Sequence, residues 1–135
     1  METLASDQDA PYHAHVYYTH ETRAAAYALH SLLLNATGAE NTLGLLFVGQ
    51  MRDRKVGPHP EPQFEVHFLK ADLQRVLPIL KASGLTVLVH PLTDDDLADH
   101  TTLAHWIGSP MSLDLTTLDP PGMNRGTARF GKADV

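Results

Sequence analysis

Histidine is the residue type through which this chain could do chemistry. The sequence has nine histidines among 135 residues and no cysteine. The absence of cysteine excludes disulfides, thiolate zinc sites and a cysteine nucleophile. Imidazole and carboxylate together suit zinc, iron(II), copper or nickel. Two histidines and one carboxylate would leave coordination positions open, as in non-haem iron(II) oxygen chemistry.

Two of the histidines stand two residues apart in a segment with the composition of a β-strand. Residues 12–18 are rich in aromatic and β-branched side chains. Because side chains alternate along a strand, His13, His15 and Tyr17 should share one face. Taken alone, this pattern also fits a pair of solvated histidines. On a site face, Tyr17 could donate a hydrogen bond to a substrate oxygen, which makes it a candidate substrate-binding residue.

Two further predicted strands carry polar side chains on a matching face. Residues 63–68 alternate, so that Glu65 and His67 face away from three apolar side chains, and His90 ends an apolar strand over residues 86–90. If each apolar set faces the helices, the polar sets meet on the other side of the sheet. The side chains expected to converge there are His13, His15, Glu65, His67 and His90.

The sequence leaves the position or the role of four side chains open. His59 lies in a proline-containing loop over residues 50–62 and could fold over the histidine face. His100 lies on the apolar stripe of a predicted helix and fits either a hydrogen-bonded core histidine or the site. His67 fits either the substrate-binding wall or the solvated rim of the sheet. Glu65, facing the cluster, is a candidate ligand or general base.

The order of predicted elements indicates the fold that must position these side chains. Apolar residues recur at helical spacing over residues 25–33 and 73–80, which predicts two helices, the first ending near Gly38 and the second near Gly84. Pro78 should kink the second helix or force a loose turn in it. A second strand is predicted over residues 43–48 and a C-terminal helix over residues 94–107. The order β-α-β-β-α-β, followed by that helix, predicts an α+β protein with a ferredoxin-like antiparallel sheet. In it, the first strand lies between the third and the fourth.

Length and composition predict the organisation around this sheet. The chain suits a single domain over residues 1–135, with residues 1–10 and 119–135 as poorly ordered extensions. Both helices cover one face, so the other face needs cover, and a sheet-to-sheet homodimer would supply it.

Charge and hydropathy exclude several classes of partner. The formal net charge is −6, and no basic stripe is present, which argues against nucleic acid. No apolar run approaches a membrane span, and residues 1–5 do not resemble a signal peptide, so a cytoplasmic protein is predicted. Glycine-rich phosphate loops and serine-hydrolase motifs are absent, which disfavours nucleotide cofactors and serine hydrolysis.

An ordered set of short segments resembles a known family. The segments are YHAHVYY at residues 12–18, GPHP at 57–60, FEV at 64–66, VLVHP at 87–91, DH at 99–100 and WIG at 106–108. Together they resemble the small DOPA 4,5-dioxygenase family of extradiol ring-cleaving enzymes, over about residues 11–115. The extension after residue 115 lies outside the resemblance.

The resemblance implies a fold, a metal and a reaction. It implies a ferredoxin-like fold, non-haem iron(II), dioxygen and a catechol substrate such as L-DOPA. Cleavage at the 4,5 position would give seco-DOPA, which cyclises to betalamic acid, whereas 2,3 cleavage would lead to muscaflavin. The histidine motifs of the family carry over onto His13, His15, His59 and His90, and Glu65 matches the acidic form of the third motif.

The reaction that the resemblance implies gives these residues expected roles. We expect the metal ligands to be His15, His59 and His90, with Glu65 as a carboxylate alternative. His13, His59, Glu65 and His100 are candidates for proton transfer, and Tyr17 and His67 for substrate binding. A histidine cannot act as a ligand and as a proton donor at once, so His59 can fill only one of its two roles.

Other functions remain compatible with the same residues. One is a cofactor-free oxygenase of ferredoxin-like fold, in which histidines act as bases. Another is a histidine-rich metal-binding or regulatory module without catalysis. A cupin barrel also uses His-x-His, but cupins are almost entirely β and the two predicted helices argue against one.

Overall fold

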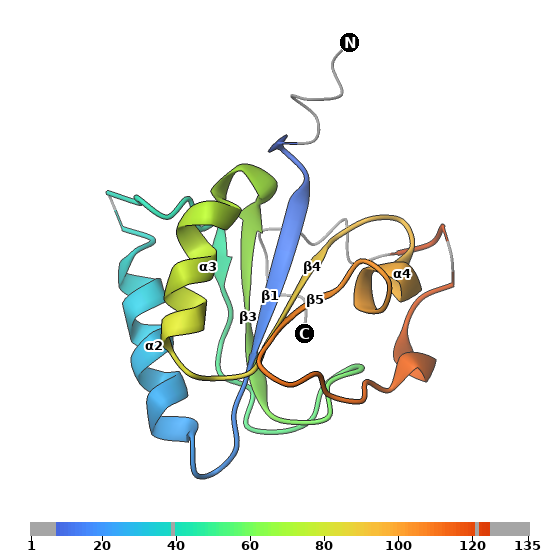
Figure 1. Cartoon of the computed structure of the whole chain (residues 1–135), viewed down its shortest axis with the longest axis horizontal. Helices are drawn as coiled ribbons and strands as arrows, with labels where there is room; N and C mark the ends of the chain where they lie inside the picture. The colour runs from blue at the N-terminus through green and yellow to red at the C-terminus, as the bar shows by residue number, and fades with distance from the viewer. Residues whose placement is uncertain (1–7, 39, 121, 125–135) are drawn as a thin grey trace.

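A computed structural model describes residues 8–38, 40–120 and 122–124. It shows one antiparallel sheet with strand order β2-β3-β1-β4-β5 (Figure 1). The elements are β1 Pro11–Tyr17, α2 Arg23–Asn35, β2 Phe47–Val48, β3 Gln63–Leu69, α3 Leu73–Ala82, β4 Val87–Pro91, α4 Asp96–His100 and β5 His105–Ile107, with short 3-10 turns η1 Lys70–Asp72 and η2 Leu115–Thr117.

The central strand β1 pairs with β3 on one side and with β4 on the other. The predicted position of the first strand between the third and fourth is therefore confirmed. In this register His13 lies opposite His67 of β3 and opposite His90 of β4, and His15 lies opposite Glu65. Directly opposed residues have their side chains on the same face of a sheet. Backbone pairing alone thus gathers these five side chains on one face.

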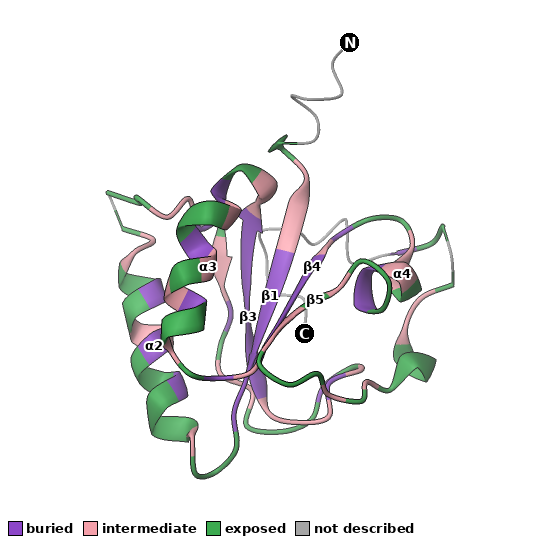
Figure 2. Cartoon of the chain, in the orientation of Figure 1, coloured by how far each residue is buried: buried purple, intermediate pink, exposed green. Residues whose placement is uncertain are grey.

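The other face of the sheet forms the hydrophobic core with α2 and α3, which lie side by side (Figure 1). Alternate residues of the strands point toward these helices, and the central strands are buried for most of their length (Figure 2). The core includes Ala14, Val16, Phe64, Val66, Phe68, Val87 and Val89 from the sheet, and Ala26, Leu29, Leu33, Val76 and Leu80 from the helices. The prediction that each apolar set faces the helices is confirmed.

The C-terminal helix predicted over residues 94–107 is wrong in extent. Helix α4 spans only Asp96–His100, and β5 follows and pairs with β4. Two threonines after His100 are poor helix formers, whereas the aromatic and β-branched residues of β5 favour an extended strand. Trp106 lies opposite Leu88 in this pairing, so tertiary contact with the sheet edge decides the structure.

The second predicted strand also differs from the structure in extent. The strand expected over residues 43–48 is reduced to Phe47–Val48. Pro78 lies inside α3, which continues from Leu73 to Ala82. A proline removes one backbone donor, but the amphipathic face of α3 still buries Val76 and Leu80, and this packing retains the helix.

The histidine face is covered by segments of the same chain. Residues of the loop before β3, of α4 and of the segment after η2 lie over it. Residues 119, 120 and 122–124 of the predicted C-terminal extension are described, and Asn124 is buried and hydrogen-bonded to Thr93 and Asp99. The remaining residues of both predicted extensions, 1–7, 121 and 125–135, lie outside the described part. A homodimer is not needed to cover this part of the sheet and stays a prediction.

No helix in the described part of the chain combines the length and the apolar character needed to cross a lipid bilayer.

Neighbouring leucines of α2 offer a matched test of this packing. Leu33 is fully buried in the core, whereas Leu32 is 51% exposed. We expect Leu33→Ala to lower the free energy of unfolding by about 2–5 kcal/mol because it leaves a cavity. Leu32→Ala should change it by no more than about 0.5 kcal/mol. Urea unfolding followed by circular dichroism measures both, and equal losses would show that α2 packs through a different face.

Candidate functional site

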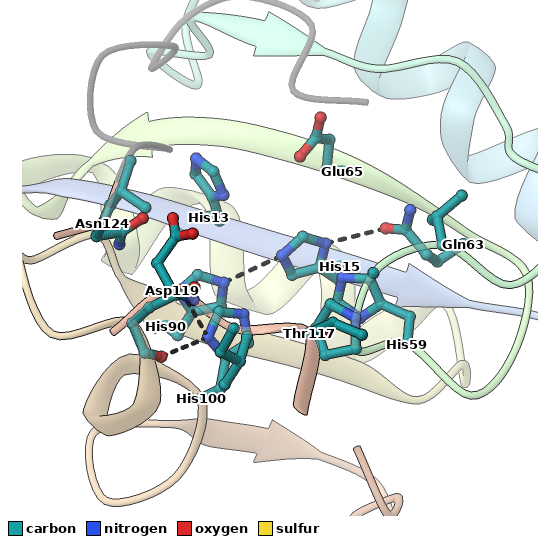
Figure 3. Close-up of a pocket in the computed structure, with 16 residues that line it drawn as sticks. His13, His15, His59, Gln63, Glu65, His90, His100, Thr117, Asp119 and Asn124 are labelled. Carbon is teal, nitrogen blue, oxygen red and sulfur yellow. Dashed lines mark hydrogen bonds and ion pairs between the residues drawn. The ribbon is translucent and has the colours of Figure 1, made fainter. Parts of the chain in front are cut away.

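A cluster of imidazole rings lines a cavity on the face of the sheet opposite α2 and α3 (Figure 3). The cavity has a volume of about 310 Å³. Its polar lining comes from β1, β3, β4, α4, the loop before β3 and the segment from η2 onward. The polar and charged residues concerned are His13, His15, His59, Gln63, Glu65, His90, Asp96, His100, Thr117, Asp119 and Asn124.

His15 and His90 are held so that two ring nitrogens face each other. The Nε2 atoms of the two rings are 3.0 Å apart. His90 Nδ1 lies 2.7 Å from the carbonyl oxygen of Pro91, and His15 Nδ1 lies 2.9 Å from Oε1 of Gln63. Both oxygens can only accept, so each Nδ1 donates its proton. In the neutral rings, both Nε2 atoms then carry lone pairs, and a shared cation would satisfy both.

Burial keeps these rings neutral. Burial, with smaller contributions from neighbouring histidines, lowers the pKa of His13, His15 and His90 well below its usual value. The same causes lower the pKa of His59 to about 3. A neutral imidazole is the form that binds a metal, whereas an imidazolium cannot. The cluster therefore has the protonation state that a metal site requires.

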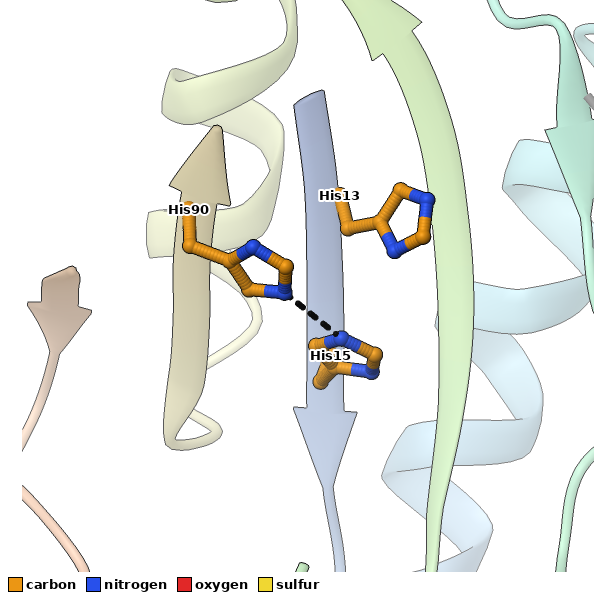
Figure 4. A group of neighbouring side chains, drawn as sticks. All are labelled: His13, His15 and His90. Atoms are coloured by element: carbon orange, nitrogen blue, oxygen red, sulfur yellow. Dashed lines mark hydrogen bonds between the residues drawn. The ribbon is translucent and has the colours of Figure 1, made fainter. Parts of the chain in front are cut away.

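His13 completes a group of possible metal ligands with His15 and His90 (Figure 4). One ligand atom from each residue lies within 4.8 Å of the other two, and all three side chains are buried. Nδ1 of His15 and of His90 each donates to an oxygen, which is the outer-shell arrangement expected of metal-binding histidines. The residues present therefore fit a transition-metal ion, with His13, His15 and His90 as its holders.

His100 enters the cavity from α4. Its ring centroid lies 4.3 Å from that of His90, and its Nδ1 lies 2.8 Å from the carbonyl oxygen of Asp96. Both alternatives considered for His100 are thus realised at once, since the ring is hydrogen-bonded to its own helix and also lines the site. Burial alone would raise the pKa of Asp96, but hydrogen bonds from His100 and from the Asp119 N–H lower it overall.

His59 folds over the cluster from its loop, as predicted. Its ring centroid is 4.1 Å from that of His15, and its Nδ1 lies 2.6 Å from the hydroxyl of Tyr17. Burial raises the pKa of Tyr17 far above its usual value, so the phenol stays protonated. Tyr17 also stacks on Trp106, with ring centroids 5.9 Å apart. Tyr17 therefore contacts His59 from behind the cavity wall and is not among the residues that line the cavity.

A second group of donors lies beside the first, toward β3. The rings of His13 and His67 are nearly parallel, with centroids 3.9 Å apart, and Nε2 of His67 lies 3.4 Å from a carboxylate oxygen of Glu65. His67 is fully buried, so its placement on a solvated rim is wrong. It packs behind His13 because β3 is an inner strand covered by β2, and Phe47 of β2 contacts its ring.

The histidines predicted to converge lie together in the structure, but the sequence analysis did not single out their hydrogen-bond partners. Gln63 accepts a hydrogen bond from Nδ1 of His15. Because Gln63, Glu65 and His67 are two residues apart along one strand, their alternation predicts that Gln63 also lies on the site face. Asp96 falls at the start of the helix predicted over residues 94–107, and Asp119 and Asn124 fall in the extension predicted over residues 119–135. The positions of these three side chains in the site depend on how the chain folds after β4, which the sequence pattern does not determine.

Comparison with known proteins finds similar sequences over most of the chain. A profile of the Dopa 4,5-dioxygenase family matches residues 12–117. The chain belongs to this family. A DOPA 4,5-dioxygenase from Amanita muscaria is 30% identical over 126 residues, covering 87% of this chain and 54% of that protein. An uncharacterised 21.2 kDa protein from Botryotinia fuckeliana is 34% identical over 74 residues, covering 47% of this chain and 40% of that protein.

A solved structure shows that the similarity extends to the fold of this chain. A crystal structure from Nostoc punctiforme, provisionally described as a dioxygenase, superposes with a TM-score of 0.70 at 31% identity, covering 82% of this chain and 91% of that one. The curated relatives are longer, since the matches span only about half of their length. The mixed α+β fold with an antiparallel sheet is thus shared with a dioxygenase-like protein.

The buried neutral histidines make the stability of the metal-free protein depend on pH. Their pKa is lowered in the folded state, so below about pH 6.5 the unfolded chain binds protons that the folded chain does not. Stability is therefore full above about pH 6.5 and falls as the pH drops toward 3, the folded pKa of His59. Each of the four histidines should contribute about 1.4 kcal/mol per pH unit at most.

Urea unfolding of chelator-treated protein at pH 7.5, 6.5 and 5.5 measures this dependence. The free energy of unfolding should fall by several kcal/mol between the first and the last pH. His59→Gln removes one of the four groups and should make the slope shallower. A free energy that stays constant across this range would mean that the rings are protonated or solvated in the folded protein.

Proposed function

We propose that the chain is an extradiol dioxygenase that opens the ring of a catechol such as L-DOPA, using non-haem iron(II) and O2. Membership of the Dopa 4,5-dioxygenase family supports the reaction class. The observation that carries the proposal is the pair of facing Nε2 atoms of His15 and His90, which lie 3.0 Å apart and are buried. Cleavage between carbons 4 and 5, giving seco-DOPA and then betalamic acid, is the expected course.

The metal would be held by His13, His15 and His90. This set replaces the expected set of His15, His59 and His90, because the ligand atoms of His13 meet those of the other two. Imidazole ligands suit iron(II) as well as zinc or copper, and iron(II) is the metal that the family resemblance implies. Bound iron(II) would supply Lewis-acid activation of the catechol and electron transfer between the catechol and O2.

His59 is then available for proton transfer. Its Nδ1 is occupied by the Tyr17 hydroxyl. If that hydroxyl donates, the ring proton of neutral His59 sits on Nε2, where it can be given to an oxygen of the reacting substrate. Tyr17 is thus a positioning residue for His59. Glu65 lines the cavity as a carboxylate and is the candidate to accept a catechol proton.

The charge of the cavity wall supports a substrate that carries an ammonium group. The lining residues include three carboxylates, on Glu65, Asp96 and Asp119, and among the described residues none is lysine or arginine. Such a wall favours a cationic amine over an additional anionic group. L-DOPA and its decarboxylated amine meet this condition, whereas a catechol bearing only a carboxylate does not.

The segment from η2 onward would exclude water during the reaction. The Asp119 N–H donates to Asp96, and the buried Asp99 accepts hydrogen bonds from Thr93 and Asn124. These bonds hold the segment against the cavity through α4. A water-poor cavity strengthens the electrostatic interactions of the charged and polar groups inside it.

A ferredoxin-like topology, a homodimer and a cytoplasmic location remain parts of the proposal.

Anaerobic loading with iron(II), followed by L-DOPA and air, tests the function. A yellow ring-opened product that depends on iron, and whose mass equals the substrate plus two oxygen atoms, is the expected result. Bound iron without product would favour a histidine-rich metal-binding module. Product formed after iron has been removed by a chelator would favour a cofactor-free oxygenase.

Variants separate the holders of the metal from the proton-transfer residues. We expect His90→Ala to lose both bound iron and turnover, because it removes one of the facing Nε2 atoms. His59→Ala should keep the iron and lower turnover by about 10²–10⁴-fold. His105→Ala, which changes an exposed histidine of β5, should alter neither. Iron content by elemental analysis and product formation by absorbance are the measurements, and full iron in His90→Ala would overturn the ligand set.

A further inference from the structure

The place of the Glu65 carboxylate depends on the residues next to it. Glu65 lies on β3, is 5% exposed and is among the residues that line the histidine cavity (Figure 3). One of its carboxylate oxygens lies 3.4 Å from Nε2 of His67. Because a glutamate side chain rotates about several bonds, contacts with its neighbours decide where the carboxylate lies. The proposed function assigns proton transfer to this carboxylate, so its placement bears on the reaction.

Gly49 stands opposite Glu65 at the edge of the sheet. In the β2–β3 pair, Val48 lies opposite Val66. The N–H of the next residue, Gly49, donates to the carbonyl oxygen of Glu65 at 2.8 Å, so the register of the pair continues to Gly49. Directly opposed residues have their side chains on the same face of a sheet. A side chain at position 49 would therefore lie beside that of Glu65.

The absence of a side chain at Gly49 leaves room for Glu65. A Cβ atom at position 49 would lie 3.0 Å from Cγ of Glu65 and 3.3 Å from Cε2 of Phe47. Carbon atoms in favourable contact are about 3.5–4.0 Å apart, so a neighbour would have to move. Gly49 is not among the glycines with a positive φ, so its backbone conformation does not itself require glycine. The close approach of Glu65 is the reason that position 49 favours glycine.

His30 of α2 holds the backbone of Gly49 in place. Nε2 of His30 lies 2.8 Å from the carbonyl oxygen of Gly49, which can only accept, so the ring donates. The same ring packs edge to face against Phe64, with ring centroids 5.0 Å apart. Backbone groups at the edge of a sheet lack a partner strand, and β2 is the edge strand. The hydrogen bond from His30 therefore anchors this edge to the helix layer.

The Glu65 side chain has space into which it can be displaced. A second cavity of about 170 Å³ adjoins it and is lined by Glu65, Gly49 and neighbouring residues of β2, β3 and the segment after β2. A Cβ at position 49 would therefore move the Glu65 side chain by a few tenths of an ångström rather than push the paired strands apart. A displaced side chain carries its carboxylate with it.

We propose that Gly49, anchored by His30, is a positioning residue for Glu65. By carrying no side chain, Gly49 lets the Glu65 carboxylate lie where it can accept a proton from a catechol hydroxyl in the histidine cavity. This proposal rests on the proposed function. The step moves one proton from a catechol oxygen to a carboxylate oxygen and requires no oxidant or reductant. Neither Gly49 nor His30 is among the residues that line the histidine cavity, so both act through Glu65.

Nuclear magnetic resonance of the metal-free protein tests the contact without recourse to activity. The chain has five glutamates, so isotopic labelling of their side-chain carboxyl carbons gives few resonances, and Glu65→Gln assigns that of Glu65. We expect Gly49→Ala to shift this resonance and to leave the others in place. His30→Phe keeps a ring against Phe64 but loses the donor, and it should shift the same resonance.

Gly38→Ala is the matched control for this measurement. Gly38 is an exposed glycine without a positive φ, and a Cβ there would meet the carbonyl oxygen of Asn35 at 3.4 Å. We expect this variant to leave the Glu65 resonance and the turnover unchanged. Thermal unfolding shows which variants are folded, and His30→Phe carries the same test if Gly49→Ala does not fold.

Turnover of L-DOPA by the iron-loaded protein tests whether the placement of Glu65 matters to the reaction. Gly49→Ala should keep the bound iron and the KM, because His13, His15 and His90 are unchanged. It should lower kcat by about 10-fold, less than the ~10²-fold that a misplacement of about 1 Å can cost. In the Glu65→Ala background, Cγ is gone, so Gly49→Ala should cause no further loss of kcat.

The outcomes for the two proposals can be told apart. A Glu65 resonance that stays in place in Gly49→Ala, or an equal loss of kcat in both backgrounds, would overturn the positioning role. Ring cleavage that Gly49→Ala leaves at full rate would also overturn it, while the proposed function would stand. Absence of ring cleavage by the unchanged, iron-loaded protein would overturn the proposed function, whereas a shifted resonance would still support the contact between Gly49 and Glu65.

Discussion

The site depends on the pairing of β1 with β3 and with β4. Antiparallel pairing in this register places His13 opposite both His67 and His90, and places His15 opposite Glu65. A shift by one residue would turn every one of these side chains toward the helices and expose the valines and phenylalanines of the core. The hydrophobic face therefore specifies the polar face. Packing of α2 and α3 against the apolar residues is what holds the donors in place.

The face of the sheet that carries the cluster buries imidazole rings, whereas the opposite face packs apolar side chains against helices. Burying polar groups is unfavourable unless their hydrogen bonds are made. Here the Pro91 carbonyl, Gln63, Tyr17 and the Asp96 carbonyl each bond to one ring nitrogen of a different histidine. These bonds orient the rings, and burial lowers the pKa of His15, His59 and His90, which keeps those three rings neutral. The same features that satisfy the interior thus prepare the remaining nitrogens to bind a cation.

The cover of this face comes from parts of the chain with little regular structure. Asp99 is fully buried, and burial raises its pKa, while hydrogen bonds from Thr93 oppose that rise. Asn124 donates a hydrogen bond to Asp99, and the Asp119 N–H donates to Asp96, so the segment after η2 is connected to α4. The sheet therefore supplies the donors, and the less regular segments supply the enclosure and the acidic wall. This division of roles fits a site whose chemistry is constant and whose substrate preference can vary with the cover.

Alternation along residues 12–18, 63–68 and 86–90 was sufficient to predict which side chains share a face, because the period of a strand is two whatever its neighbours are. It predicted the convergence of His13, His15, Glu65, His67 and His90, and the apolar positions of the core. The sequence could not show that residues 105–107 form a fifth strand, that His67 is fully buried, or that Asn124 closes the cavity. Each of these depends on contacts between segments far apart in the chain, and only the folded structure brings those segments together.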